Sequence, residues 1–93
     1  MTTLRQRMIE LLREEELDAL DLSQILSIRE KEVYEHLPHI AKSVAAAGET
    51  LVIHPYVCLN CEYTFKERSR FNRPGRCPRC REGHIRMATY IIR

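Results

Sequence analysis

Two stretches of sequence, Cys58-Leu59-Asn60-Cys61 and Cys77-Pro78-Arg79-Cys80, contain all four cysteines of the chain. Fifteen residues separate these CxxC pairs, which matches the spacing of four-cysteine zinc sites. Zinc takes four thiolates in a tetrahedron, and each CxxC turn offers two sulfurs to one ion. The four cysteines are therefore predicted to hold one structural zinc ion with no open coordination position.

There are three alternatives to a four-cysteine zinc site: a redox motif, an iron site and a histidine ligand. A redox motif needs one CxxC at a helix start, whereas here two matched pairs lie in a loop-and-strand region. An iron site of the rubredoxin type uses the same four ligands, so the spacing leaves iron as an alternative. His84, four residues after Cys80, is the only credible substitute ligand, and the four sulfurs leave it no place in the shell.

The segment around the cysteines is too poor in large apolar side chains to order itself through a core of its own. A structural zinc contributes an apparent ~10–16 kcal/mol in small peptides, which is enough to fold such a segment. Four aromatic residues are expected to pack around the two turns: Tyr56, Tyr63, Phe65 and Phe71.

Capping motifs predict helices in the first half of the chain. Thr3 and Gln6 form a capping box that starts a helix over residues 4–15, and Asp18 can cap a second helix. Ser27 and Glu30 form another candidate box that starts a third helix after a minimal turn. Two helices joined so tightly predict a helix-turn-helix.

The third helix has an apolar stripe of Val33, Leu37, Ile40 and Val44. Pro38 lies inside this helix and is expected to kink or split it near Leu37, because proline removes a backbone donor. The helix is expected to end at Gly48.

Two β-rich stretches follow. Residues 50–53 and 87–92 are candidate strands that have no obvious partner except each other. If they pair as the wing of a winged helix-turn-helix, the cysteine segment is an insertion in the wing.

The charge is unevenly placed. The formal net charge is only +2, yet residues 1–57 carry six Lys/Arg against ten Asp/Glu, and residues 58–93 carry nine against three. Candidate DNA-binding residues are Arg29, Lys31 and Tyr34 on the third helix and Lys66, Arg68, Arg70, Arg73 and Arg76 between the cysteine pairs. The alternative for both groups is an ordinary solvated surface, and the carboxylates of Glu30, Glu32 and Glu35 would repel phosphates.

Several motifs resemble one family over nearly the whole chain: residues 21–28, the helix carrying His36-Leu37, and residues 51–55 leading into Cys58. That family comprises transcriptional regulators in which a winged helix-turn-helix is fused to a rubredoxin-like zinc ribbon. The resemblance implies a DNA-binding role, a ribbon inserted in the wing, dimerisation as a candidate property, and Cys58, Cys61, Cys77 and Cys80 as the ligands. The sequence departs from the pattern where the turns usually have glycine, with Glu62 after Cys61 and Arg81 after Cys80.

The expected fold is thus α+β, with a three-helix winged helix-turn-helix over residues 1–55, a zinc ribbon over 56–86 and a returning wing strand over 87–93. We expect a DNA-binding transcriptional regulator with double-stranded DNA as its partner. The alternative is a protein-interaction module, with a protein partner or a second copy of the chain, and a rubredoxin-like electron carrier ranks below both.

No catalytic grouping, phosphate-binding glycine loop or open metal site predicts an enzyme or a small-molecule substrate. No apolar run long enough for a membrane span and no signal core is evident, so a cytoplasmic protein is expected.

Overall fold

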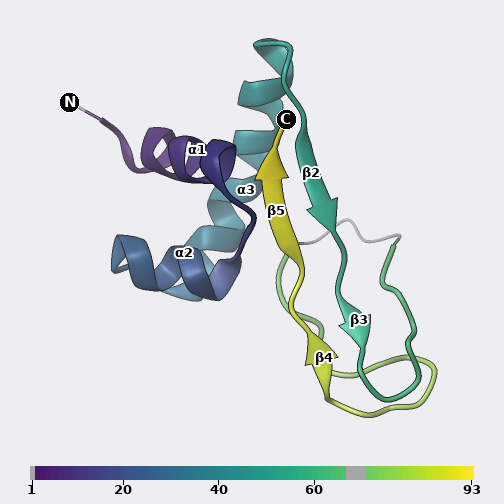
Figure 1. Ribbon diagram of the computed structural model, residues 1–93. Coiled ribbons are helices and arrows are strands. Elements are labelled where there is room, and N and C mark those ends of the chain that lie inside the picture. Colours follow the sequence, from purple (N-terminus) through teal and green to yellow (C-terminus); the bar gives the residue numbers. More distant parts are fainter. Residues whose placement is uncertain (1, 67–70) are drawn as a thin grey trace.

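The computed structural model describes residues 2–66 and 71–93. Figure 1 shows the helices gathered around the upper part of strands β2 and β5, with a loop-rich lobe that contains β3 and β4 at the lower end. In chain order the elements are α1 (Leu4–Glu14), β1 (Leu17–Asp18), α2 (Ala19–Leu26), α3 (Glu30–Ala46), β2 (Leu51–His54), β3 (Val57–Cys58), β4 (Ile85–Arg86) and β5 (Thr89–Ile92). The protein is therefore α+β, with two small antiparallel sheets among the described residues.

Capping boxes start the first two helices; the sequence predicted the box at Thr3 and, for the second helix, the cap at Asp18 alone. The Thr3 side chain accepts from the Gln6 N–H, and the Gln6 side chain accepts from the Thr3 N–H. Asp18 and Asp21 make the same reciprocal pair at the start of α2. Each box satisfies two N–H groups at or beside the start of its helix, which fixes where that helix begins.

The predicted capping box at Ser27 is wrong. Ser27 has a left-handed backbone (φ 56°, ψ 45°) and ends α2, because its N–H donates to the Ser23 carbonyl. An N-cap residue needs an extended backbone, so Ser27 cannot also start α3. Arg29 takes the N-cap position instead and makes no side-chain capping bond. The turn between α2 and α3 therefore comprises residues 27–29.

Pro38 does not split α3, which runs unbroken from Glu30 to Ala46. Its ring lies on the exposed side of the helix, where water can replace the missing backbone donor. The apolar stripe of Val33, Leu37, Ile40 and Val44 is buried, as predicted.

Gly48 ends α3 in the way the sequence predicted. Its φ is +82°, its N–H donates to the Ala45 carbonyl, and the Glu49 N–H donates to the Val44 carbonyl. These paired bonds form a Schellman motif, which favours glycine at the left-handed position. The chain then reverses into β2.

The main sheet has the strand order β1-β5-β2. β2 and β5 pair antiparallel with Leu51 opposite Ile92 and His54 opposite Thr89, so the predicted strands do pair with each other. β1 adds a short strand on the other side of β5, with Leu17 opposite Tyr90. The sequence analysis missed this strand, which is only two residues long.

Between these paired strands, residues 55–66 and 71–88 form the lower lobe. Their second sheet contains β3 and β4, with Val57 opposite Arg86 and Cys58 opposite Ile85. An isolated bridge joins Val57 and Thr64. The lobe thus extends the direction of the β2–β5 pair.

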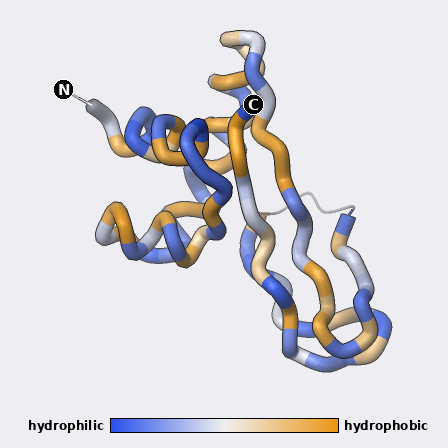
Figure 2. Tube along the Cα trace, in the orientation of Figure 1, coloured by the Kyte–Doolittle hydropathy of each residue, from blue (hydrophilic) through white to orange (hydrophobic). Residues whose placement is uncertain are grey.

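One buried cluster runs through both parts of the molecule. It contains Met8, Leu12, Leu22, Leu37 and Ile40 from the helices, Tyr90 and Ile92 from β5, and Tyr56, Cys58, Phe65 and Cys77 from the lobe. Figure 2 shows hydrophobic stretches along the upper parts of β2 and β5 and on the helices beside them. The lobe is therefore anchored in the same core as the helices. Within the described ranges, no helix has the length and apolar character needed to cross a bilayer.

Candidate metal centre

The fold brings the four cysteines of the two CxxC pairs together. Their Sγ atoms all lie within 4.8 Å of one another, and the distances are 3.4 Å for Cys58 to Cys80 and 3.6 Å for Cys61 to Cys77. Sulfurs at the corners of a tetrahedron about 2.3 Å from a central ion are about 3.8 Å apart. The cluster therefore has the dimensions of a four-sulfur metal site and could hold one metal ion.

The sulfurs are thiols rather than disulfides, since all four cysteines are free. Cys58 and Cys77 are buried, and Cys61 and Cys80 are partly buried. Within residues 2–66 and 71–93 this is the one group of three or more potential ligand side chains close enough to share an ion, and no histidine belongs to it.

Each CxxC pair lies on a turn of the same construction. In the first, the Cys58 N–H donates to Tyr63 and the Glu62 N–H donates back to Cys58. In the second, the Cys77 N–H donates to Glu82 and the Arg81 N–H donates back to Cys77. Because the turns match, each places its two sulfurs toward the same point.

The residue after each pair has a left-handed backbone, with φ 64° at Glu62 and 65° at Arg81. These are the two positions at which the resemblance described above leads one to expect glycine. A non-glycine residue in this region costs roughly 1–2 kcal/mol, so both turns carry backbone strain.

Replacing Glu62 with glycine is expected to stabilise the metal-loaded lobe. Relief of roughly 1–2 kcal/mol of strain is partly offset by the extra freedom of glycine in the unfolded chain, roughly 0.4–1 kcal/mol. A net gain of about 0.5–1 kcal/mol should appear as a higher denaturation midpoint of the metal-loaded chain.

The matched variant Glu62→Val should lower that midpoint, because a β-branched residue tolerates positive φ poorly. Equal midpoints for the glycine and valine variants would contradict the strain argument.

Hydrogen bonds around the sulfurs favour the thiolate form. The Arg79 N–H lies 3.4 Å from the Cys77 Sγ. Burial alone would raise the pKa of Cys77, but N–H groups of Cys80 and Arg79 outweigh it and lower the pKa. The side chain of Asn60, followed by the Glu82 N–H, lowers the pKa of Cys80 to about 6. The sequence analysis missed Asn60, which no metal-site motif marks.

The four sulfurs cannot all ionise easily without a cation. The Tyr63 N–H acts to lower the pKa of Cys61, yet burial and the three neighbouring sulfurs together raise that pKa to about 12. A metal cation would remove this conflict, because it stabilises every thiolate at once. The donor set therefore fits a positively charged ion held by four sulfurs.

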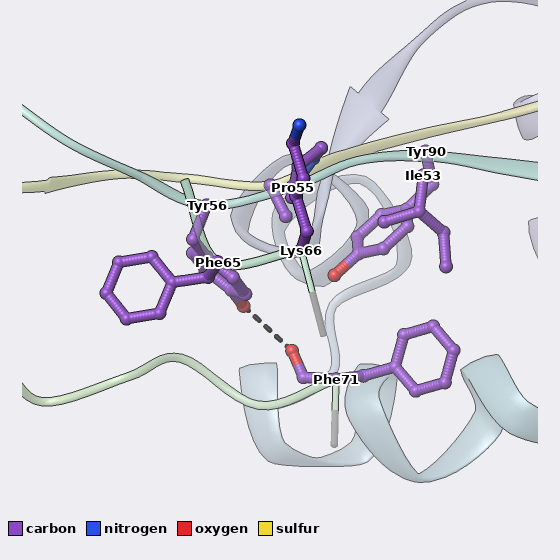
Figure 3. Close-up of a pocket in the computed structure, with 8 residues that line it drawn as sticks. Ile53, Pro55, Tyr56, Phe65, Lys66, Phe71 and Tyr90 are labelled. Atoms are coloured by element: carbon purple, nitrogen blue, oxygen red, sulfur yellow. Dashed lines mark hydrogen bonds between the residues drawn. The ribbon is translucent and has the colours of Figure 1, made fainter. Parts of the chain in front are cut away.

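Aromatic side chains pack within the lobe and between the lobe and the main sheet. The rings of Tyr63 and Phe65 meet edge to face with centroids 5.0 Å apart, and Tyr56 and Phe65 are buried. Phe71 contributes elsewhere, because its ring lies 6.1 Å from that of Tyr90 in the main sheet. Tyr56, Phe65, Phe71 and Tyr90 are among the residues that Figure 3 shows around a cavity of about 320 Å³ between the lobe and the sheet.

The predicted DNA-binding residues fall into three groups. Arg29, Lys31, Lys66 and Arg76 are exposed. Tyr34 and Arg73 instead bind the carboxylate of Glu30, and the Arg73 pair is bidentate. Arg68 and Arg70 lie outside the described residues. No sequence pattern marked the pairing of Arg73 with Glu30, because 43 positions separate them.

A family model and a solved structure match this chain. No curated protein matches it. The solution NMR structure of protein PF0610 from Pyrococcus furiosus matches with a TM-score of 0.83 and 32% identity, covering 97% of this chain and 88% of that chain. The family described as PF0610-like, N-terminal, matches residues 3–52. This chain therefore belongs to the PF0610-like family.

Proposed function

We propose that the metal is zinc and that its role is structural. Four sulfurs close the coordination shell and leave no position for water or substrate, as in structural zinc sites. A four-sulfur iron site has the same ligands, so the colour of the protein distinguishes them: iron bound to thiolates absorbs visible light and zinc does not.

We propose further that the protein is a DNA-binding transcriptional regulator of the winged helix-turn-helix class. The observation that carries this proposal is the succession of α2, a three-residue turn (27–29), α3 and the paired strands β2 and β5. In this assignment α3 is the recognition helix and residues 1–55 are the DNA-binding domain. The wing is formed by β2 and the returning strand within 87–93, and residues 56–86 are a rubredoxin-like zinc ribbon inserted between them.

Exposed cations support contact with phosphates. Arg29 and Lys31 lie at the start of α3, and Lys66 and Arg76 lie on the ribbon segment. A helix that enters the major groove approaches bases with its N-terminal residues, while cations beside it hold the backbone.

The expected binding to duplex DNA depends steeply on salt. If these four exposed cations meet phosphates, log K should fall against log salt with a slope of about −3.6, from roughly 0.9 per phosphate. Affinity would then fall by about 150-fold between about 50 and 200 mM salt. A fluorescence anisotropy titration of labelled duplex over this range measures the slope.

Arg76→Gln should reduce the slope by about one unit, whereas Lys42→Gln, in the C-terminal half of α3, should leave it unchanged. Absence of binding even at the lowest salt would exclude the DNA-binding proposal.

A protein-interaction module is the second candidate, and exposed apolar side chains favour it. Leu20 and Ile25 on α2 are 42% and 46% exposed, and Leu59 at the first CxxC turn is 62% exposed. Apolar groups presented in this way suit a protein partner better than a nucleic acid backbone. Loss of a partner, with no effect on DNA, in a Leu59→Ser variant would favour this function.

A further inference from the structure

The segment before the second CxxC pair is tied to the start of α3 by an ion pair. Arg73 donates from Nη2 to Glu30 Oε1 at 2.8 Å and from Nε to Oε2 at 3.2 Å. The side chains are 49% and 26% exposed, respectively. This bidentate geometry holds a guanidinium against the first residue of α3, which is where a recognition helix would meet DNA.

Two tyrosines strengthen the same junction. Tyr34, one turn along α3, donates its hydroxyl proton to Glu30 Oε2 at 2.5 Å. Burial raises the pKa of Tyr34, and the bond to Glu30 raises it further, so the hydroxyl stays a donor. The Tyr56 hydroxyl lies 3.4 Å from that of Tyr34 and donates to the Phe71 carbonyl at 2.8 Å, the contact drawn in Figure 3.

The chain segments just before the two CxxC pairs both contact this junction. Tyr56 lies two residues before Cys58, and its backbone carbonyl accepts from the Phe65 N–H at 2.9 Å. Arg73 lies four residues before Cys77. Ordering the two CxxC turns around an ion therefore also positions Tyr56 and Arg73 against α3.

We propose that Arg73 is a positioning residue through which metal binding controls the charge at the start of α3. With the ion bound, Arg73 neutralises Glu30, and the recognition helix presents Arg29 and Lys31 to phosphates. When the CxxC turns lose the ion, Arg73 no longer pairs with Glu30, and the unpaired Glu30 carboxylate repels the DNA backbone. The metal centre then acts as a switch for DNA binding, a role that rests on the proposed function.

The expected size of the effect is modest and measurable. A carboxylate about 7 Å from a phosphate in water costs about 0.6 kcal/mol by Coulomb's law, which is about threefold in affinity. Loss of the ordered Arg73 side chain should therefore weaken DNA binding by about threefold at low salt.

The coupling is tested without DNA by NMR of the zinc-loaded chain before and after excess chelator. Chelation should shift the amide signals of residues 30–34 and the Arg73 Nε–H signal, and should leave those of residues 44–46 near their original positions. Arg73→Gln should shift the signals of residues 30–34 while one zinc stays bound, and Arg76→Gln, three residues further on, should not. Unchanged signals at residues 30–34, or equal shifts at both ends of α3, would overturn the route through Arg73.

DNA binding then tests the charge argument with three zinc-loaded variants. Arg73→Gln should bind duplex DNA about threefold more weakly than the unaltered chain, as argued above. Adding Glu30→Gln restores the net charge of the junction, so the double variant should regain the original affinity, whereas Glu30→Gln alone should not weaken binding. Equal weakening in Arg73→Gln and the double variant would mean that Arg73 contacts phosphate directly, which overturns its positioning role. If no variant binds DNA, the proposed function fails, and the NMR result alone decides whether the metal centre is coupled to α3.

Discussion

Replacing Cys58 with alanine is expected to abolish stoichiometric metal binding and to unfold the lobe around the two CxxC turns. Cys58 is fully buried and contributes one of the four sulfurs that could hold the ion. The apparent binding free energy of a structural zinc is about 10–16 kcal/mol, and it is also folding free energy for a lobe with few large buried side chains. Elemental analysis of the purified variant and limited proteolysis of the lobe measure the two effects.

The helical part should survive this change. Most of the buried core side chains come from α1, α2, α3 and β5 and pack against one another, so the far-ultraviolet signal of the helices should persist. Leu59→Ala is the matched control, because Leu59 lies in the same turn with an exposed side chain. A Cys58→Ala variant that keeps one metal ion and resists proteolysis as the control does would contradict the account.

Replacing Tyr90 with alanine is expected to lower the free energy of unfolding by about 3–5 kcal/mol, the range for removing a large buried aromatic ring. Tyr90 is 1% exposed, lies opposite both Leu17 and Ile53, and contacts the Phe71 ring. Its ring therefore joins the helical core, the main sheet and the lobe. A chain of this size has only ~5–15 kcal/mol of stability, so the loss should be visible as a large fall in the urea midpoint.

Ile91 provides the control for Tyr90, because it is the next residue on β5 and its side chain points to the opposite, less buried face. Ile91→Thr keeps a β-branched side chain and should cost about 1 kcal/mol or less. If the two variants lose similar amounts of unfolding free energy, Tyr90 does not link the parts of the core as described.

Local chemistry explains why much of the fold could be predicted from the sequence. The boxes of Thr3 and Asp18 satisfy N–H groups through side chains only three residues away, and Gly48 supplies a left-handed backbone where the helix ends. The cysteine spacing likewise encodes two identical turns, so the assembly of the four sulfurs follows from short segments.

The remaining features depend on contacts between distant residues. β1 is two residues long and forms only because β5 offers an open edge beside it. Ser27 fits a capping box by composition, yet its backbone is set by the end of α2. The pairing of Arg73 with Glu30 depends on where the lobe folds back onto α3, and no periodicity in the sequence reports that.

The ratio of zinc to protein in the purified, unsubstituted chain tests the central claim most directly. The four-sulfur cluster predicts one zinc per chain and a colourless protein, measured by elemental analysis after extensive dialysis. One iron per chain with visible absorption would contradict the assignment of zinc, and no bound metal of any kind would contradict the metal centre itself.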